Sequence, residues 1–318
     1  MEKLRYGVLS TASIVPRFVA ALRESGTGEA AAMASRTAPK AAVCAKDLGI
    51  PKSYGSYEEL IADPNIDVIY VAPINSEHYR YARLALEHGK HVVCEKPFTL
   101  KSSEAEELFR LAEKKGKFIV EAQKAVFLPV MRDVRDFISS GKLGKIHFMD
   151  MTSSCGSEYN DWLHSAEAGG GALYGSSGYT LHISQILFDK EITAYSGLCS
   201  FGDSAVDEQC VVNLRLGNDM LVISKISTNV LAVNKAVIFG DLGRIEIPYY
   251  WKARMATVYY NDGKTEVFEH PCEHELVYEV EHFNKCIKDG LLQSPVMNEK
   301  MTVNALRIIE SLRGNGAS

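Results

Sequence analysis

The sequence predicts an α/β protein with a doubly wound parallel sheet in residues 1–122 and an α+β domain with a large, mostly antiparallel open sheet in residues 123–318. The chain has 318 residues, and a usual domain size of roughly 150 residues suggests two domains. The first part alternates short apolar runs with amphipathic stretches, a pattern typical of parallel strands joined by helices. The second part alternates apolar and polar residues, as antiparallel strands with one solvated face do.

The elements of the first part follow each other in regular order. Strands are expected at Tyr6–Leu9, Ala30–Ala34, Val68–Val71, His91–Cys94 and Phe118–Val120. Helices are expected between them, at Ile14–Leu22, Lys40–Leu48, Ser76–Glu87 and Ser102–Lys115. Ligands of such sheets bind outside the carboxyl ends of the strands, so the residues that follow each strand are the first candidates for a site.

The second part consists mainly of expected strands, with a helix before them and two after. The first helix is expected at Pro129–Ser139. Strands are expected at Ile146–Met151, Ile192–Phe201, Gln209–Leu216, Met220–Ser227, Val237–Phe239 and Thr257–Tyr260. Turn signals such as Asn218-Asp219 and Asp262-Gly263 separate several of them. The last two helices are expected at Glu275–Lys288 and Asn298–Leu312.

Charge and hydropathy exclude two classes of partner. The net charge is −5 and the sequence pI is near 6.0, whereas nucleic-acid binders usually carry a basic face. No apolar run reaches the length of about 18 residues that a membrane span needs. The first residues do not resemble a signal peptide. We therefore expect a cytoplasmic protein with a small-molecule partner, and neither a nucleic acid nor a membrane.

The seven cysteines point to neither a disulfide framework nor a metal ribbon. Their number is odd and no Cys-x-x-Cys pair occurs, so reduced thiols are expected. The group His270, Cys272, His274 and His282 lies among glutamates without a standard ligand spacing. We therefore expect no metal site.

The turn after the first strand is the first candidate for cofactor binding. A dinucleotide fold needs small residues there, so that the backbone turns tightly and brings amide groups and a helix N-terminus to the pyrophosphate. The sequence reads Ser10, Thr11, Ala12, Ser13 and Ile14, without the usual three glycines. An ordinary capped turn is the alternative interpretation of this segment.

The end of the second strand indicates which cofactor is preferred. NAD enzymes typically place an Asp or Glu there, which accepts hydrogen bonds from the ribose hydroxyls. This chain has Ser35-Arg36-Thr37 instead. A guanidinium can pair with a 2′-phosphate through two charge-assisted bonds and stack on adenine. We therefore predict that NADP is preferred over NAD, with a solvated surface arginine as the alternative.

Two motifs follow neighbouring strands of the first part. One is Cys94-Glu95-Lys96-Pro97, and the other is the run from Pro73 through Asn75 to His78. Together with Gly55–Leu60, Glu121-Ala122-Gln123 and Ser294-Pro295, this ordered set resembles the Gfo/Idh/MocA family of NAD(P)-dependent oxidoreductases over almost the whole chain.

The resemblance implies a Rossmann domain that binds NADP in residues 1–122. It also implies a domain in residues 123–318 that binds substrate and whose open sheet forms a homodimer or a higher homo-oligomer. It implies cofactor contacts for Pro73, Asn75, His78, Glu95, Lys96 and Gln123, with Lys96 beside the nicotinamide and the reacting hydroxyl. A cation there can stabilise a developing alkoxide or relay its proton. Glu95 could orient Lys96 or be a simple strand-end carboxylate.

The chain departs from the family pattern at the second catalytic stretch. Gly169-Gly170-Gly171 matches the family's glycine run, but the family's Asp falls on Gly175. Its His or Tyr falls on Tyr179, and a further Asp falls on His182. Tyr179 is therefore the first candidate for the acid/base partner of Lys96, and His182 the second, because both share a face if this segment is helical. A buried core tyrosine and a buried core histidine are the alternatives.

These residues predict hydride transfer between NADP(H) and a secondary alcohol or ketone of a sugar, an inositol-like polyol or a vicinal diol. The missing carboxylate leaves a second hypothesis, a redox-silent NADP-binding regulatory or scaffold protein. A third is isomerisation or elimination of a sugar with a tightly held cofactor. Turnover in an NADPH assay distinguishes the first hypothesis from the other two, and the third would form product without a net change in NADPH absorbance.

Overall fold

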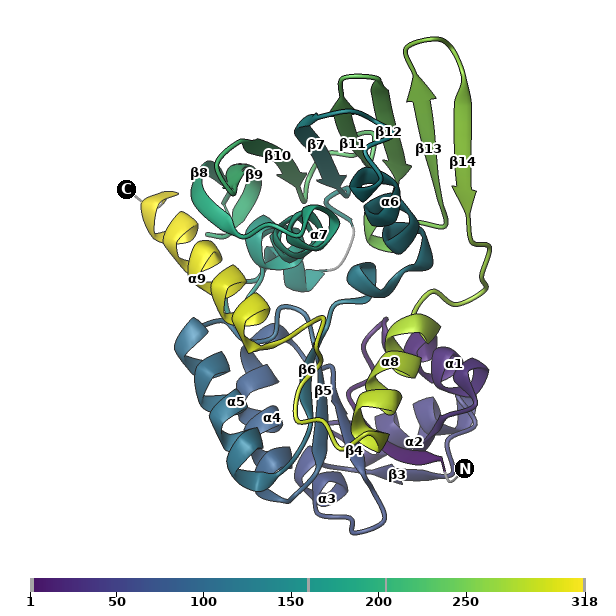
Figure 1. Cartoon of the computed structure of the whole chain (residues 1–318). Coiled ribbons are helices and arrows are strands. Elements are labelled where there is room, and N and C mark those ends of the chain that lie inside the picture. The colour runs from purple at the N-terminus through teal and green to yellow at the C-terminus, as the bar shows by residue number, and fades with distance from the viewer. Residues whose placement is uncertain (1–2, 159–160, 204, 317–318) are drawn as a thin grey trace. The chain divides into compact units, whose positions relative to one another are not determined.

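The computed structural model describes residues 3–158, 161–203 and 205–316. They form two compact units, shown in Figure 1. Unit 1 comprises Met1–Gln123 and His274–Asn304, and unit 2 comprises Lys124–Glu273 and Ala305–Ser318. Unit 1 is therefore built from two separate stretches of the chain. The assignment of cofactor binding to residues 1–122, and of substrate binding and dimerisation to residues 123–318, stays a prediction.

Unit 1 contains a six-stranded sheet in the order β3-β2-β1-β4-β5-β6, in which every pair of neighbours is parallel. The strands are β1 Leu4–Leu9, β2 Gly28–Ala34, β3 Lys52–Tyr54, β4 Val68–Val71, β5 His91–Glu95 and β6 Ile119–Ala122. This is the doubly wound order with its switch point between β1 and β4, so the predicted Rossmann fold is confirmed.

Helices connect the strands and cover both faces of this sheet. They are α1 Val15–Ser25, α2 Ala38–Asp47, α3 Tyr57–Ile61, α4 His78–Glu87 (preceded by the short η1 Asn75–Glu77), α5 Ser102–Lys115 and α8 Val277–Lys288. The helices α1 and α8 pack on each other, and so do α4 and α5 (Figure 1). Under α1 the rings of Phe18 and Tyr70 stack with centroids 3.6 Å apart, and both side chains are fully buried.

The segment His274–Asn304 completes unit 1 through specific hydrogen bonds. The buried hydroxyl of Tyr6 donates to Oδ1 of Asn284 at 2.6 Å, and Nδ2 of Asn284 donates to Thr27 at 2.8 Å. The hydroxyl of Thr302 donates to Glu121 at 2.8 Å. Buried polar groups without such partners would destabilise the fold, so this segment is part of the unit.

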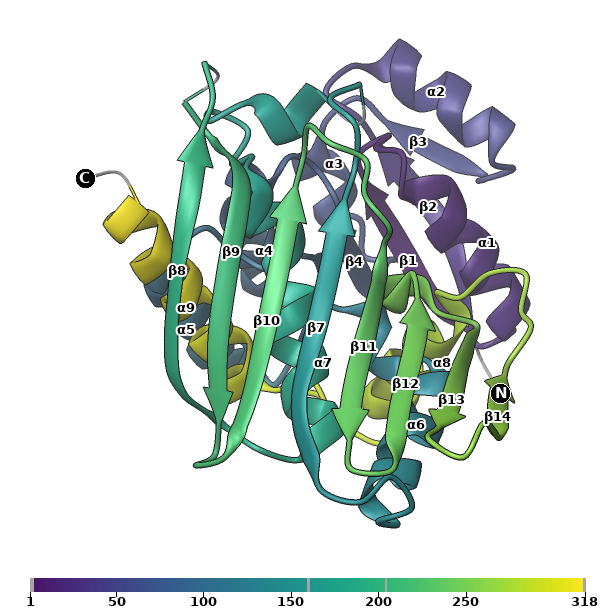
Figure 2. The ribbon, with the colours of Figure 1, turned by 90° about the horizontal axis from the view of Figure 1, so that it is seen from above.

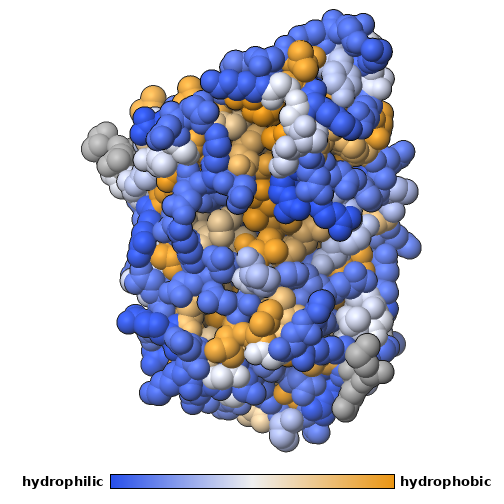
Figure 3. Space-filling model, viewed as in Figure 1, coloured by the Kyte–Doolittle hydropathy of each residue, from blue (hydrophilic) through white to orange (hydrophobic). Residues whose placement is uncertain are grey.

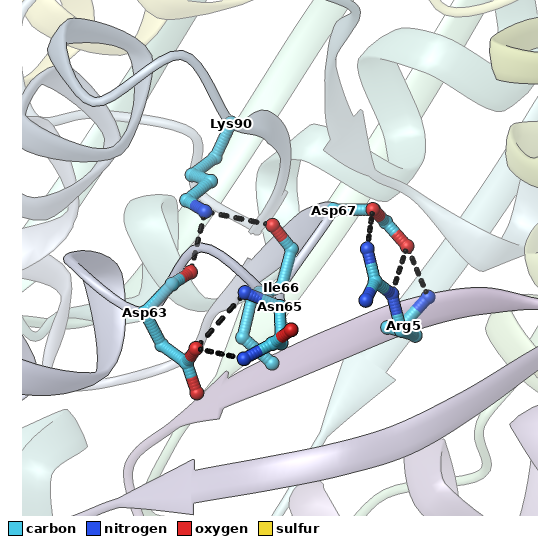
Figure 4. A network of polar contacts seen from close by, with 6 residues as sticks. All are labelled: Arg5, Asp63, Asn65, Ile66, Asp67 and Lys90. Atoms are coloured by element: carbon cyan, nitrogen blue, oxygen red, sulfur yellow. Dashed lines mark hydrogen bonds and ion pairs between the residues drawn. The ribbon is translucent and has the colours of Figure 1, made fainter.

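A polar network clamps the amino ends of β4 and β5 (Figure 4). The buried ammonium of Lys90 donates to the backbone carbonyls of Asp63 and Ile66 at 2.6 and 2.8 Å. Arg5 pairs with both carboxylate oxygens of Asp67, at 2.9 and 2.7 Å. Burial lowers the pKa of Lys90. Ligands of such sheets bind at the opposite, carboxyl edge, so this network is structural.

Unit 2 contains an eight-stranded sheet in the order β14-β13-β12-β11-β7-β10-β9-β8. The strands are β7 Ile146–Ser154, β8 Ile192–Phe201, β9 Asp207–Leu216, β10 Met220–Ser227, β11 Lys235–Gly240, β12 Gly243–Pro248, β13 Met255–Tyr260 and β14 Thr265–Glu269. Only the β7–β10 pair is parallel among the pairs of this sheet. The predicted open, mostly antiparallel sheet is confirmed.

Helices of unit 2 cover one face of its sheet, and Figure 2 shows the other face. They are α6 Pro129–Ser139, α7 Gly178–Phe188 and the part of α9 (Glu299–Gly316) that follows Asn304, with the short η2 Lys124–Phe127, η3 Asp161–His164 and η5 Tyr250–Lys252. A single π-helical turn, η4 Leu173–Ser177, leads into α7. On the covered face Cys210, Val212, Leu214 and Leu216 of β9 are buried.

Four short elements, β3, α3, β12 and β14, were not predicted from the sequence. β3 has only three residues, which are polar or aromatic, and α3 has only five. β12 and β14 do alternate in burial, but over six and five residues. Their sheet neighbours, and not their own hydrophobic pattern, supply the pairing that defines them.

The surface seen in Figure 3 is mostly hydrophilic, with apolar patches between the polar side chains. Among the described residues, no helix has both the length and the apolar character needed to cross a membrane.

Candidate active site

The turn between β1 and α1 is tight although it lacks glycine. Ser10 has a φ of 97°, a conformation that glycine usually provides. Its hydroxyl oxygen accepts a hydrogen bond from the amide of Ala12 at 3.0 Å, and its own amide donates to Ala34 at 2.9 Å. The side chain thus holds the backbone in the shape that the missing glycine would otherwise permit.

The N-terminus of α1 suits an anionic group. No acidic residue lies in its first turn, and the N-cap residue, Ile14, makes no side-chain capping hydrogen bond. Thr11, Ala12 and Ile14 are half-buried and Ser13 is exposed. A helix N-terminus with uncapped amides and a short, small-residue approach favours binding of a phosphate. The residues of this turn therefore fit the pyrophosphate of a dinucleotide.

The carboxyl end of β2 carries a positive charge close to this turn. Ser35 is buried, and the Arg36 that follows is exposed. Burial raises the pKa of Tyr57, and the charge of Arg36 and a hydrogen bond with Ser10 oppose that rise. Tyr57 thus lies near both Ser10 and Arg36, so the first turn and the second strand end converge. Tyr57 lies within the Gly55–Leu60 motif, but the sequence analysis assigned it no role in cofactor binding.

His78 joins the loops that follow β4 and β5. Its ring is 1% exposed, with Nδ1 2.8 Å from the carbonyl oxygen of Pro97 and Nε2 3.3 Å from that of Pro73. Burial lowers its pKa, so the ring is neutral near pH 7 and has one N–H to donate. The shorter contact assigns that proton to Nδ1. His78 therefore holds the loop that carries Lys96 through the backbone carbonyl of Pro97.

Glu95 holds the backbone of Lys96, the lysine of the Cys94–Pro97 motif. One carboxylate oxygen accepts the Tyr70 hydroxyl at 2.6 Å, and the other accepts the backbone amide of Lys96 at 3.2 Å. Lys96 is half-buried and follows directly after β5. Of the two interpretations of Glu95, these contacts favour an orienting role, exerted on the backbone of Lys96.

The other predicted cofactor residues also lie at the carboxyl edge of the sheet. Pro73 follows β4, and Asn75, which is 6% exposed, begins η1. Gln123 follows β6 and is fully buried. The structure thus brings together the ends of β1, β2, β4, β5 and β6, as the parallel sheet requires.

In unit 2 the glycine run permits a close backbone approach. A Cβ at Gly170 would lie 2.4 Å from the carbonyl oxygen of Trp162. Gly171, with a φ of 113°, would place a Cβ 2.3 Å from Oδ1 of Asp207, and its amide donates to Leu163 at 2.8 Å. The run therefore fits a backbone that no other residue could follow, and it sets the start of η4 and α7.

Asp207, which the sequence analysis did not identify, anchors the same turn. It is fully buried, and its Oδ2 accepts the amide of Leu173 at 2.6 Å. Nε of Arg313 lies 3.3 Å from its Oδ1. Burial raises the pKa of Asp207. Because these partners are far apart in sequence, no local pattern could have revealed them.

Tyr179 and His182 lie on α7, so the segment is helical, which is the condition for the two candidates to share one face. Tyr179 is 8% exposed and His182 is 1% exposed. The ring of Tyr179 lies 6.4 Å from that of Trp251, centroid to centroid. Both belong to unit 2, whereas Lys96 belongs to unit 1. The partnership of Lys96 with either residue stays a prediction.

Gly175 lies within the π-helical turn η4. Such turns are frequent at functional sites. A Cβ at Gly175 would lie 2.8 Å from Cδ2 of Leu163, the end of a flexible side chain. Leu163 thus lies against the position where the family carries its carboxylate.

Comparisons with known proteins agree with this geometry. Residues 4–123 match the family described as "Oxidoreductase family, NAD-binding Rossmann fold", and residues 131–246 match the "GFO/IDH/MocA C-terminal domain". Trans-1,2-dihydrobenzene-1,2-diol dehydrogenase of Xenopus laevis is 32% identical over 318 residues, with 92% of each chain covered. D-xylose 1-dehydrogenase (NADP(+)) of Hypocrea jecorina is 28% identical, over 84% of this chain and 77% of that one.

Two solved structures share the fold. Levoglucosan dehydrogenase in complex with NADH and levoglucosan superposes with a TM-score of 0.89 at 18% identity, covering 99% of this chain and 98% of that one. A 3-ketoreductase from Actinomadura kijaniata, in complex with NADP and TDP-benzene, gives a TM-score of 0.89 at 22% identity and 98% coverage of both chains.

Proposed function

The chain belongs to the Gfo/Idh/MocA family of NAD(P)-dependent oxidoreductases, and from that membership we propose that it is an NADP-preferring dehydrogenase of sugars, inositol-like polyols or vicinal diols. It moves a hydride to or from a carbon that bears a secondary alcohol or the corresponding ketone. The alternative of a redox-silent binding protein has no observation in its favour.

The placement of Lys96 carries the proposal. It follows directly after β5, at the edge of the sheet where the ends of five strands meet. Glu95 holds its backbone amide, and His78 holds the carbonyl of the next residue. Two separate contacts thus position one lysine, and a preorganised cation stabilises negative charge more strongly than a mobile one does.

The preference for NADP is supported by the charge at the end of β2. Arg36 is exposed and lies close enough to Tyr57 to oppose the rise in that hydroxyl's pKa. Ser35, Arg36 and Thr37 include no carboxylate that would repel a 2′-phosphate. Tyr57 and Arg36 are the residues that would hold this phosphate, while the N-terminus of α1 would hold the pyrophosphate.

The proposed chemistry divides between the cofactor and the side chains. The nicotinamide, when bound, accepts or supplies the hydride. Lys96 would stabilise charge on the reacting oxygen, and Tyr179 would exchange that oxygen's proton, with His182 as the second candidate. A buried phenol or imidazole on a helix is held in one orientation, which suits directed proton transfer.

The proposed substrate class rests on the named relatives and on the shape of η4. Two relatives are named for a dihydrodiol and for xylose, both of which carry neighbouring hydroxyls. Gly175 supplies no carboxylate to bind a substrate hydroxyl, and the apolar side chain of Leu163 lies beside it. This combination favours a diol that is in part apolar over a fully hydroxylated sugar.

The test is absorbance at the NADPH band with NADP or NAD and a panel of sugars, inositols and vicinal diols. We expect a substrate-dependent change that is faster with NADP and reduced at least about 100-fold in Lys96→Ala, the usual scale for losing a proton-transfer or charge-stabilising group. Lys101→Ala, which replaces the next lysine along the chain, is the matched control and should keep its turnover.

Two outcomes would count against the proposal. Unchanged turnover in Lys96→Ala would remove that residue from the mechanism. Tight NADP binding by calorimetry, without a change in NADPH absorbance on any compound, would support the redox-silent protein or a reaction that recycles its bound cofactor.

We also propose that the chain is a homodimer that associates through the uncovered face of the eight-stranded sheet. Leu198, Val211 and Leu221 are exposed there by 80%, 43% and 55%. Exposed apolar side chains on one sheet face are typical of an association surface.

A further inference from the structure

Two thiols lie opposite each other on the first hairpin of the eight-stranded sheet. Cys199 of β8 and Cys210 of β9 are direct partners in the antiparallel register, and their Sγ atoms are 2.9 Å apart. Residues opposite each other in such a pair have Cα atoms about 4.5–5.5 Å apart. That separation lies within the range of about 4.4–6.8 Å that a disulfide spans.

The two thiols differ in access and in acidity. Cys199 is half-buried, whereas Cys210 is 3% exposed. The hydrogen bond from Cys210 lowers the pKa of Cys199, and the same contact together with burial raises the pKa of Cys210. The accessible sulfur therefore becomes a thiolate more readily, and the thiolate is the form that attacks other sulfur atoms.

A metal is the other ligand that this cluster could take. The Sγ atoms of Cys199 and Cys210 and a carboxylate oxygen of Asp207 lie within 4.8 Å of one another. However, Asp207 already accepts the amide of Leu173 and lies 3.3 Å from the guanidinium of Arg313. A divalent cation would have to displace that positive charge, and a structural zinc site needs four ligands. The arrangement favours thiol chemistry.

We propose that Cys199 and Cys210 form a reversible disulfide when the chain meets a low-molecular-weight disulfide. The thiolate of Cys199 attacks one sulfur of the oxidant, which forms a mixed disulfide and releases the first small thiol. Cys210 then loses its proton and attacks Sγ of Cys199, which releases the second small thiol. Both protein thiols are oxidised, and one small disulfide is reduced to two thiols.

The bridge also changes the surroundings of Asp207. In the reduced chain Sγ of Cys210 also lies 3.4 Å from Oδ2 of Asp207. Its single proton is donated either to Cys199 or to that carboxylate, and oxidation removes it. A thiol is a weak donor, and the amide of Leu173 remains. The crosslink, in contrast, closes the loop from residue 199 to residue 210 and restricts the unfolded chain. The crosslink outweighs the lost donor, so the oxidised chain unfolds at a higher temperature.

The experiment treats the full chain with oxidised glutathione and compares it with the chain kept in dithiothreitol. Peptide mapping by mass spectrometry is expected to show a 199–210 link with the loss of two hydrogens, and dithiothreitol is expected to reverse it. The midpoint of thermal unfolding is expected to rise by several degrees. Cys199→Ser should show neither change, and Cys210→Ala provides an independent second variant.

Cys155→Ser is the matched control, because Cys155 is also half-buried and directly follows a strand of the same sheet. It should form the bridge as the unaltered chain does. The proposal is overturned if glutathione stays attached to Cys199 without closure, if the mapped bridge joins other cysteines, or if the unfolding midpoint does not rise.

Discussion

At the scale of single residues, the proposed preference for NADP rests on the charge of Arg36. It stands on the tip of β2, where an acidic residue would bind a ribose hydroxyl and repel a phosphate. Because the Arg36 side chain is exposed, its replacement tests this proposal without disturbing the core.

Arg36→Asp is expected to weaken NADP binding about 10- to 100-fold, since a charge-assisted hydrogen bond contributes roughly 1.5–3 kcal/mol. NAD binding should stay the same or improve, because the new carboxylate can accept the ribose hydroxyls. Calorimetric titration with both cofactors measures the change. Arg110→Asp, on an exposed position of α5, is the control. An unchanged NADP/NAD ratio in Arg36→Asp would rule out the assignment.

His91 gives a prediction about pH. Its Nδ1 accepts the amide of Phe118 at 2.9 Å, which requires a neutral ring. Burial, helped by the charge of Lys117, lowers its pKa to about 4. The unfolded chain, with a histidine pKa near 6.5, therefore binds the proton first. The contribution of the neutral His91 to the free energy of unfolding is fully present above about pH 6.5. It is lost as the pH falls from there toward 4.

At pH 4 this loss amounts to about 3 kcal/mol at most, from the linkage between the two pKa values. His91→Asn keeps an acceptor in place of Nδ1 and should flatten the dependence of the free energy of unfolding on pH over this window. Urea unfolding at several pH values measures it. The exposed His88→Asn serves as the control. An equally steep pH dependence in both variants would contradict the role of His91.

At the scale of elements, the glycine run and η4 determine how α7 begins. Gly171 takes a left-handed φ against Asp207, while Gly175 faces only the end of the Leu163 side chain. The two glycines therefore differ in what a methyl group would displace, a buried carboxylate in one case and a movable methyl in the other.

Gly171→Ala is expected to lower the free energy of unfolding by about 3 kcal/mol or more, because backbone strain adds to the displacement of a buried carboxylate. Gly175→Ala should cost no more than about 1 kcal/mol, since the gain in helix propensity offsets the movement of Leu163. Equilibrium unfolding in urea compares them. Equal costs would show that the contact with Asp207 does not matter.

The long elements could be predicted from the sequence, because their hydrophobic period is unambiguous. The strand at Ile192–Phe201 and the helix at Pro129–Ser139 have the predicted bounds. The three residues of β3 carry too little pattern, and β3 forms because β2 pairs with it. The helix α7 was not predicted from the sequence, and its helical form was used only as the condition for Tyr179 and His182 to share one face, since the glycines before it obscure the period.

The residues of the candidate site also fall into those that the sequence could identify and those that it could not. Lys96 and His78 lie in motifs with fixed spacing, so the sequence identified them. Tyr57, Asp207 and Asn284 act through partners brought close only by folding, such as Leu173 for Asp207. Leu173 and Asp207 are 34 residues apart, and no local sequence pattern predicts that they form a hydrogen bond.

At the scale of the whole molecule, the uncovered sheet face predicts the oligomeric state. In Figure 2 this face carries no helix of unit 2, and Leu198 is its most exposed large apolar residue of β8. We expect a dimer in analytical ultracentrifugation and a monomer for the double variant Leu198→Glu/Leu221→Glu, because like charges would meet across a symmetric contact. The matched control Val43→Glu alters an equally apolar surface residue of α2, exposed by 63%. A monomeric unaltered chain would refute the dimer.

Unit 1 is closed by residues from two distant stretches of the chain, and this affects the order in which the protein can fold during its synthesis. Asn284 and Thr302 supply the partners of Tyr6 and Glu121. When the ribosome has released the first 123 residues, those partners do not yet exist. All eight strands of unit 2 emerge before them. The sheet nearest the N-terminus is therefore completed after the other sheet's strands are available, and a chaperone that binds nascent chains would meet it in an unfinished form.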